Sequence, residues 1–138
     1  MLFHFVDKKV RINHTIKVQD FISEIFQKEK ISFRRIDYIF CSDNYLLPIN
    51  KKFLHHNYYT DTISFTMNDD PLIGEIYISL DRIKDNSKKY KVLLGQEMLR
   101  VMFHGALHLC GYSDKTEKDI ELMRFKENIY LELFNEGT

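Results

Sequence analysis

The sequence predicts an α+β fold, with a small mixed four-stranded sheet packed with about five helices. Short runs rich in β-branched and aromatic residues, typical of strands, alternate with longer stretches whose apolar residues recur three and four positions apart, as in helices. No repeat, low-complexity tract or proline- and glycine-rich linker divides the 138 residues. This length is typical of one domain, so we expect a single domain over residues 1–138.

The N-terminal region predicts a strand followed by a helix. Residues 2–6 (LFHFV) alternate apolar and polar side chains over the length of a short strand. Residues 15–30 carry isoleucine and phenylalanine at helical spacing, and Thr15 stands where a side-chain oxygen can cap the first turn.

A second strand and helix follow. Residues 32–42 alternate aromatic and aliphatic residues with polar ones, which predicts a strand. Ser42 and Asp43 then open a short helix that runs to about Leu54. Because proline lacks an N–H donor, Pro48 predicts that this helix is kinked or begins late.

The middle of the chain predicts a β-hairpin. Residues 62–68 and 72–79 are rich in β-branched residues, and the turn-forming residues DDP between them permit a reversal. Residues 81–91 are polar, and no element is predicted there. Three apolar side chains of the two runs are expected in the core: Phe65, Met67 and Ile78.

Two helices complete the predicted fold. Residues 92–110 are mostly apolar, and we expect this helix to stop at Gly111, because glycine readily adopts the positive φ found after many helices. Thr116 can cap a last helix. The apolar contacts of that helix are expected from Ile120, Met123, Ile129, Leu131 and Leu133.

Composition excludes several classes of protein. The 20 Lys and Arg balance the 20 Asp and Glu, so any surface for RNA has to be local. Cys41 and Cys110 are too few for a disulfide framework and, in apolar surroundings, predict buried reduced thiols. The N-terminus lacks the order of a signal peptide, and no apolar run reaches the length of a membrane span. We therefore expect a cytoplasmic protein without membrane contact.

Two histidines one helical turn apart predict a metal site. His104 and His108 stand four residues apart in the predicted helix, so both imidazoles face the same side. Gly111 lets the chain reverse, and Asp114 can then return toward the two rings. Imidazole nitrogen and carboxylate oxygen both bind Zn²⁺, so we expect one zinc ion per chain, held by His104, His108 and Asp114. The plainer interpretation is a pair of histidines that serves only packing or the surface.

The spacing H-x3-H-x2-G-x2-D is that of the metzincin zinc motif with two differences, so we expect a metzincin-like site helix. Aspartate replaces the third histidine, and Gly105 replaces the glutamate that takes a proton from zinc-bound water. Gly105 cannot act as a base, which argues against peptide hydrolysis.

Two charged residues precede the histidines on nearly the same helix face. Glu97 lies about two turns before His104 and is either a partner of a metal ligand or a helix-start carboxylate without a catalytic role. Arg100 lies one turn before His104 and either meets a phosphate or pairs with Glu97. Both are candidate catalytic helpers of a zinc-bound water.

The segment FHGALHLCGYSD (103–114) resembles the H-G-x-L-H-L-x-G-Y-D-H signature of the YbeY family of bacterial metal-dependent endoribonucleases. Weaker blocks occur in the family's order, and these are IN (49–50) with Phe53, TDTISF (60–65) and GEIYIS (74–79). The resemblance covers roughly residues 32–130. It implies a metal-dependent endoribonuclease-like domain that acts in ribosomal RNA maturation, with His104 and His108 as metal ligands.

The chain departs from the family pattern at two positions. Asp114 stands where the third metal histidine is expected, which bears on the identity and affinity of the metal. Leu54 stands where the family has an arginine that is held to matter for RNA phosphates. His56, two residues later, either substitutes as a donor or is a loop residue without a role.

An RNA strand would need a cleft with positive charge and aromatic faces beside the metal. The strand with Gly74 and Glu75 is expected to line this cleft, as the edge strand does in metzincin-shaped folds. Thr60, Asp61 and Ser64 are either functional or only hydrogen bonders of turns and strand ends. Candidate RNA contacts, which are alternatively a solvated face, are Lys51, Lys52, Arg82, Lys84, Lys88, Lys89, Tyr90 and Lys91.

The function that the resemblance implies is that of a single-strand-specific endoribonuclease that matures the 3′ end of 16S ribosomal RNA and serves ribosome quality control. Its chemistry would use a zinc-bound water or a zinc-polarised phosphate, and its partners would be ribosomal RNA and the small ribosomal subunit. Two alternatives are a ribosome-associated assembly factor with a structural metal and, less favoured, a small zinc peptidase.

Overall fold

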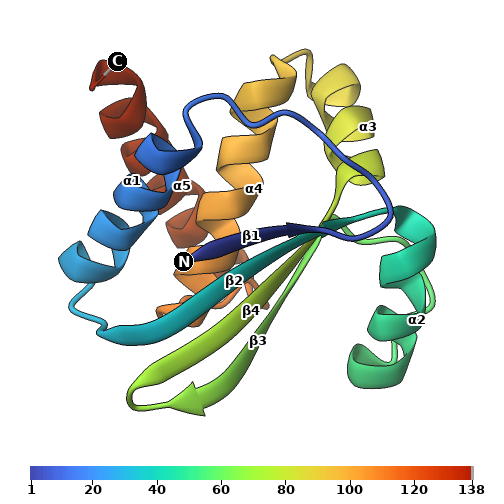
Figure 1. The fold of residues 1–138 in the computed structure, drawn as a ribbon, viewed down its shortest axis with the longest axis horizontal. Coiled ribbons are helices and arrows are strands. Elements are labelled where there is room, and N and C mark those ends of the chain that lie inside the picture. Colours follow the sequence, from blue (N-terminus) through green and yellow to red (C-terminus); the bar gives the residue numbers. More distant parts are fainter. Residues whose placement is uncertain (138) are drawn as a thin grey trace.

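The computed structural model describes residues 1–137, which form four strands and five helices joined by loops (Figure 1). In chain order they are β1 (Leu2–Phe5), α1 (Thr15–Lys28), β2 (Phe33–Cys41), α2 (Asp43–Leu54), β3 (Thr62–Asp69), β4 (Leu72–Ser79), α3 (Leu80–Tyr90), α4 (Leu94–Leu109) and α5 (Glu117–Glu136). The predicted α+β class is confirmed. No helix in this part of the chain has both the length and the apolar character needed to cross a lipid bilayer.

The sheet is mixed, as predicted, with the strand order β1-β2-β4-β3. Strands β1, β2 and β4 run parallel, and β3 pairs antiparallel with β4 through a tight hairpin. Strand β4, which carries Gly74 and Glu75, therefore lies inside the sheet, and the expectation that it behaves as an edge strand is wrong. The hairpin places β3 outside β4, so β3 is one edge strand of the sheet and β1 is the other.

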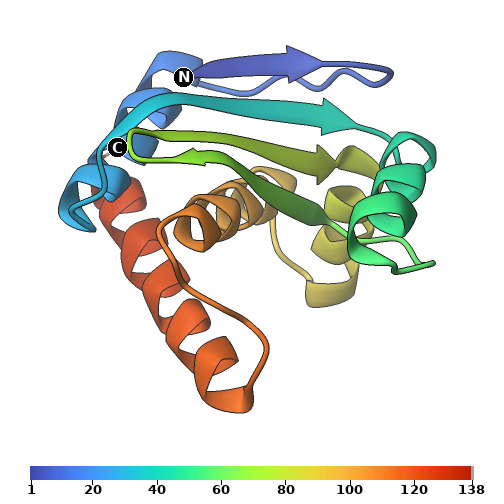
Figure 2. The same cartoon turned by 90° about the horizontal axis from the view of Figure 1, so that it is seen from below.

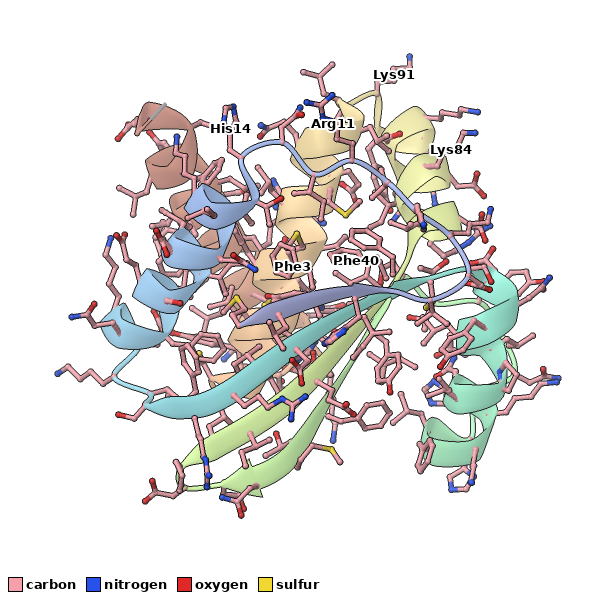
Figure 3. All side chains as sticks on the ribbon, viewed as in Figure 1. Phe3, Arg11, His14, Phe40, Lys84 and Lys91 are labelled. Carbon is pink, nitrogen blue, oxygen red and sulfur yellow. The ribbon has the colours of Figure 1, made fainter. Side chains whose placement is uncertain are left out.

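Helices α1, α4 and α5 lie on one side of the sheet, and α2 lies beyond one end of it (Figure 2). Strand side chains alternate across the pleat, so Tyr38 and Ile76 point to the helices and are fully buried with Phe103 of α4. The aromatic packing continues to the β1 edge, where the rings of Phe3 and Phe40 have centroids 5.6 Å apart (Figure 3).

Two glycines allow α4 to approach the sheet closely. A Cβ atom on Gly105 would lie 2.6 Å from Cγ2 of Ile76 and 3.3 Å from Oγ of Ser64. A Cβ atom on Gly74 of β4 would lie 2.8 Å from Cδ1 of Leu109. Larger residues at these two positions would push the helix away from β3 and β4, because a packed interior has little free volume.

Helix α1 begins at Thr15 as predicted, but without the predicted cap. The N-cap position is His14, with φ of 57°, and its side chain makes no capping hydrogen bond. Thr15 Oγ1 instead donates to the carbonyl oxygen of Ile12, 3.1 Å away. The helix ends at Lys28, two residues before the predicted end.

Helix α2 accommodates its proline. The helix begins at Asp43, where Ser42 accepts a hydrogen bond from the backbone N–H of Tyr45, so the predicted cap is correct. Pro48 lies inside the helix, and a late start is therefore excluded.

The polar segment 81–91, for which no element was predicted, is helix α3. Ser79 caps it by accepting from the backbone N–H of Arg82 at 3.3 Å. Ile83 and Ser87, one turn apart, are its buried residues. Ile83 is its only fully buried apolar side chain, and the segment is so polar overall that few apolar residues mark its buried face in the sequence.

Helix α5 starts at the predicted cap, where Thr116 and Asp119 form a reciprocal capping box. Of the expected apolar contacts, Met123 and Leu131 are buried and Ile129 is half-buried. The expectation is wrong for Ile120 and Leu133, which are 51% and 38% exposed. The first turns of α5 extend away from the sheet beyond α4 (Figure 2), which leaves Ile120 uncovered.

Other expectations about burial are resolved by strand position. Ile78 is fully buried as predicted, and Phe65 is half-buried on the other face of the sheet. Met67 is 61% exposed, so its assignment to the core is wrong; it follows Thr66, where the pairing register of β3 shifts near the hairpin end. Cys41 and Cys110 are free thiols, and burial raises the pKa of each to about 12.

Candidate metal centre

His104, His108 and Asp114 converge at the C-terminal end of α4. His108 Nε2 lies 2.9 Å from His104 Nε2 and 3.1 Å from Asp114 Oδ2. His104 Nε2 lies 3.5 Å from the same oxygen. Ligand atoms around a tetrahedral zinc with bonds of roughly 2.0 to 2.2 Å lie about 3.3 to 3.6 Å apart. The three atoms are thus already near ligand spacing without a rearrangement of the backbone.

Local sequence explains this convergence. The four-residue spacing places both imidazoles on one side of α4, with ring centroids 4.5 Å apart. The helix then ends, and Gly111 adopts φ of 105°, which strongly favours glycine. The backbone N–H of Tyr112 donates back to the carbonyl of Leu107 at 3.1 Å, and the reversed chain carries Asp114 to the rings.

The inner nitrogen of each ring is held by an oxygen. His104 Nδ1 lies 2.7 Å from Glu127 Oε2, and His108 Nδ1 lies 2.9 Å from the backbone oxygen of Tyr112. The Tyr112 hydroxyl in turn donates to Glu29 Oε1 at 2.5 Å, which ties the reversed chain to the end of α1. Carboxylate and carbonyl partners of this kind fix the tautomer and orientation of metal-binding histidines.

This hydrogen bonding leaves three acceptors facing one another. The partners of both Nδ1 atoms only accept, so each Nδ1 donates, and the lone pair of each neutral ring is at Nε2. The carboxylate of Asp114 adds a third acceptor at the same point. Three acceptors without a donor between them repel one another, and a cation removes that repulsion. The donor set therefore fits Zn²⁺, which takes imidazole nitrogen and carboxylate oxygen.

Glu127 dominates the electrostatics of His104. Burial lowers the pKa of His104, but the hydrogen bond to Glu127 and the charges of Glu127, Asp61 and Asp114 outweigh it, so the pKa is raised. Burial alone would raise the pKa of Glu127, yet its hydrogen bonds with His104 and Arg100 leave it lowered. Glu127 is therefore ionised at neutral pH although only 5% of its surface is exposed.

The three candidate catalytic helpers lie around this centre in different ways. Arg100 donates to Glu127 Oε1 and Asn128 Oδ1, each at 2.8 Å, and so pairs with α5 and not with Glu97. Glu97 is buried and accepts a 3.4 Å hydrogen bond from Asn86, and within residues 1–137 it makes no hydrogen bond or ion pair with His104 or His108. His56 lies on the loop after α2.

Sequence reasoning missed Glu127, the residue that holds His104. It follows His104 by 23 positions and reaches it only because α5 packs along α4. One signal was present: Glu127 interrupts the buried stripe that Met123, Tyr130 and Phe134 form on α5. A carboxylate in an apolar stripe indicates a buried partner.

Two cavities flank the three candidate ligands. The first, of about 300 Å³, lies between α3, α4 and α5, and its lining includes Asp61, Asn86, Tyr90, Glu97, Arg100, His104, Asp114, Arg124 and Glu127. The second, of about 580 Å³, lies along β3 and the loop before it, and its lining includes Asn50, Leu54, His56, Tyr58, Thr60, Thr62, Ser64, Thr66, His108, Asp114 and Lys115. Asp114 belongs to both, so the candidate centre lies where they meet.

Edge strand β3, and not β4, lines the site. Neither Gly74 nor Glu75 lines either cavity, whereas Thr60 and Ser64 line the second. Ser64 also donates to the carbonyl of Gly105 at 3.1 Å, which joins β3 to α4. Asp61 lines the first cavity and accepts from Asn86 at 3.3 Å.

The seven basic residues that were candidates for RNA contact line neither of these two cavities. Of all eight candidates, only Tyr90 lines a cavity next to the ligands. Arg82 is bound by Asp43 and Asp85, and Lys84 and Lys91 extend outward from the α3 region (Figure 3). The cations that do line the two cavities are Arg100, Arg124 and Lys115.

Comparisons with known proteins agree with the sequence resemblance. The family model described as Endoribonuclease YbeY matches residues 3–135. The chain is 42% identical to Endoribonuclease YbeY of Cytophaga hutchinsonii over 135 residues, covering 96% of this chain and 94% of the relative. It is 46% identical to that of Flavobacterium psychrophilum over 117 residues, covering 84% of each.

The fold has a solved counterpart as well. The solution structure of TM1509 from Thermotoga maritima superposes with a TM-score of 0.66 at 23% sequence identity, covering 96% of this chain and 88% of that one. This likeness bears on the fold, while the family match and the relatives carry the sequence evidence. The chain belongs to the endoribonuclease YbeY family.

Proposed function

We propose that this protein is a zinc-dependent, single-strand-specific endoribonuclease that matures the 3′ end of 16S ribosomal RNA and serves ribosome quality control. The observation that carries the proposal is the meeting of His104 Nε2, His108 Nε2 and Asp114 Oδ2 between two cavities. Three protein ligands leave a fourth position of a tetrahedral ion for substrate or water, as in catalytic zinc sites.

In this proposal the chain holds one ion and orients its ligands. When bound, zinc supplies positive charge that polarises a phosphate oxygen and acidifies water. Glu127 and the Tyr112 carbonyl keep both Nε2 atoms directed at the ion. Arg100 keeps Glu127 charged, and its pairing leaves Arg124 as the other guanidinium on the wall of the first cavity.

Glu97 is the group that we assign to proton transfer. It lies on the wall of the first cavity, and its burial, with the charge of Asp61 adding and the Asn86 hydrogen bond opposing, raises its pKa above the ordinary carboxyl value. A carboxyl group whose pKa moves toward neutrality both accepts and returns a proton more readily near pH 7. Gly105, where a zinc protease has its glutamate, has no side chain to do this.

The partners and location follow from the same chemistry. A strand of ribosomal RNA on the small ribosomal subunit is the proposed substrate, reached while it is single-stranded. The cytoplasm is the proposed location, because free thiols such as Cys41 and Cys110 persist in a reducing compartment. The whole activity is assigned to one domain.

Metal removal tests the function. Protein loaded with one equivalent of zinc is expected to cut a single-stranded RNA that carries the 3′ end of 16S ribosomal RNA. Chelation should abolish cleavage, and added zinc should restore it, because the ligands alone supply no positive charge to the phosphate. A duplex of the same sequence is the control and should stay intact. Cleavage that survives complete chelation would contradict the proposal.

Replacing Glu97 with glutamine tests the proton-transfer role. Cleavage should fall by about 10²–10⁴-fold, the usual contribution of general acid–base catalysis, while zinc content stays at one ion per chain. The folded state raises the pKa of Glu97, so its ionisation costs stability as pH rises through that range. The glutamine variant should therefore unfold at a higher temperature than the parent at pH 7, and the difference should shrink toward pH 4.

The role assigned to Glu97 is tested by RNA cleavage and by thermal unfolding. Cleavage rates of the zinc-loaded proteins and thermal unfolding of the metal-free proteins are measured at each pH. Unchanged cleavage by Glu97→Gln at neutral pH would remove Glu97 from catalysis. The assembly-factor alternative gains support if the protein co-sediments with small ribosomal subunits and cuts no single-stranded RNA.

A further inference from the structure

The second cavity has a chemistry that differs from the first. The first is lined by four carboxylates, those of Asp61, Glu97, Asp114 and Glu127. The second has Asp114 as its only acidic side chain among its lining residues, together with hydroxyl groups of β3, two histidines and one lysine. A polyanion beside the metal centre is therefore repelled less on the β3 side.

An aromatic pair forms the rim of this cavity. The rings of His56 and Tyr58 have centroids 5.0 Å apart with 32° between their planes. The Tyr58 hydroxyl lies 2.5 Å from His56 Nδ1, and 57% of the Tyr58 surface is exposed. When Nδ1 accepts from this hydroxyl, the proton of the neutral ring is at Nε2, where it is a donor for an anion.

Asn50 of α2 holds the loop that carries this pair through two hydrogen bonds. Asn50 Nδ2 donates to the carbonyl of Tyr58 at 2.9 Å, and the Asn50 carbonyl accepts from the His56 N–H at 3.3 Å. Asn50 is 1% exposed, and its Oδ1 has no hydrogen-bond partner among residues 1–137. Asn50 therefore holds the backbone of the loop that carries Tyr58 and His56 against α2.

One lysine lines this cavity together with the aromatic pair and two of the candidate metal ligands, His108 and Asp114. Lys115 directly follows the ligand Asp114 and lines the same cavity as Tyr58. Lys115 has no salt bridge within 4.0 Å among the described residues, unlike Arg82 and Arg100. The lining of one cavity therefore combines a planar aromatic face, a positive charge and two candidate metal ligands.

We propose that the second cavity, called the β3 cavity from here on, is a nucleotide subsite for single-stranded RNA, with a base stacked on the Tyr58–His56 pair and its phosphate against Lys115. Every base offers a planar face, and stacking on an aromatic side chain contributes about 1–3 kcal/mol per base. Duplex RNA keeps its bases stacked inside the helix and cannot use this face. The proposal rests on the proposed RNA cleavage and names how that site holds its substrate.

Binding of a short RNA tests the subsite. The zinc-loaded full chain is titrated with a single-stranded hexanucleotide that contains 2-aminopurine, whose fluorescence reports stacking. Tyr58→Ala is expected to weaken binding by about tenfold, or about 1.4 kcal/mol, and to remove the fluorescence change. Tyr58→Phe keeps the ring and should bind within about twofold of the parent. Lys115→Gln should lower the slope of log affinity against log salt by about 0.7.

A matched control lies next to the site. Tyr59 is 48% exposed on the same loop, but its ring faces Arg82 and does not line the cavity. Tyr59→Ala should therefore bind like the parent, and all variants should keep one zinc per chain. Equal losses for Tyr58→Ala and Tyr59→Ala, or no loss for Tyr58→Ala, would overturn the proposal. So would a short peptide that displaces the RNA in a Tyr58-dependent way.

The subsite and the proposed catalysis fail in different ways. If the parent binds the hexanucleotide with the expected Tyr58 dependence but cleaves no RNA, the subsite stands and the nuclease proposal is wrong. If the parent cleaves RNA while Tyr58→Ala keeps full affinity, the nuclease proposal stands and the subsite is wrong.

Discussion

Replacing His108 with alanine is expected to abolish both zinc binding and RNA cleavage. His108 Nε2 lies closest to the other two candidate ligand atoms. Its removal leaves only His104 Nε2 and Asp114 Oδ2, which are 3.5 Å apart. Loss of a ligand's hydrogen-bond partner alone costs about 10–100-fold in metal affinity, and loss of the ligand itself should exceed this. Elemental analysis after zinc loading and a single-stranded RNA cleavage assay measure the two effects.

His55→Asn is the matched control for this variant. His55 is an exposed histidine with φ of 58° that lines neither cavity beside the ligands, and asparagine tolerates this backbone conformation. This control should keep one zinc per chain and the parent cleavage rate. Cleavage by His108→Ala at the parent rate would contradict the proposed role of the metal site.

Replacing Glu127 with alanine is expected to weaken zinc binding by about 10–100-fold and to destabilise the fold. The substitution removes the partner of His104 Nδ1, so the ring loses its fixed tautomer. It also leaves Arg100 without its carboxylate at a helix–helix contact. Breaking a buried ion pair costs about 3–5 kcal/mol; because Arg100 is 24% exposed, we expect about 2–3 kcal/mol here.

A graded pair of variants separates the two effects of Glu127. Glu127→Gln keeps an oxygen for His104 Nδ1 but removes the charge, so its loss of zinc affinity should be smaller than that of Glu127→Ala. Glu132→Ala on the exposed side of α5 should change neither zinc affinity nor denaturant unfolding. Zinc titration and urea unfolding are the measurements, and unchanged zinc affinity in Glu127→Ala would contradict the assigned role.

The departures from the family signature acquire a physical meaning in the structure. Asp114, where the signature has histidine, still brings an oxygen within 3.1 and 3.5 Å of the two Nε2 atoms. Leu54, where the family pattern has arginine, lines the β3 cavity without charge. The cation of that cavity is Lys115 instead, which sequence reasoning did not single out because it is one lysine among many.

The main errors of prediction arose where local pattern and tertiary position differ. Helix α3 has only Ile83 and Ser87 buried, and the segment is so polar overall that no element was predicted there. Met67 is an apolar residue of a strand and was therefore expected in the core, yet it lies at a register shift near the hairpin end, where its side chain is exposed. Strand β4 was expected at an edge, and only the hydrogen-bonding of β2 on its other side places it inside.

The sequence by itself determined the α+β class, most element boundaries and the three candidate ligands. These depend on short-range geometry: a four-residue helical spacing, a glycine with positive φ and a chain reversal over six residues. Only the tertiary structure decided that Glu127 holds His104, that Arg100 pairs with Glu127, and that β3 forms the edge beside the site. Those contacts join residues far apart in the chain, and packing of whole helices and strands, which no local pattern encodes, brings them together.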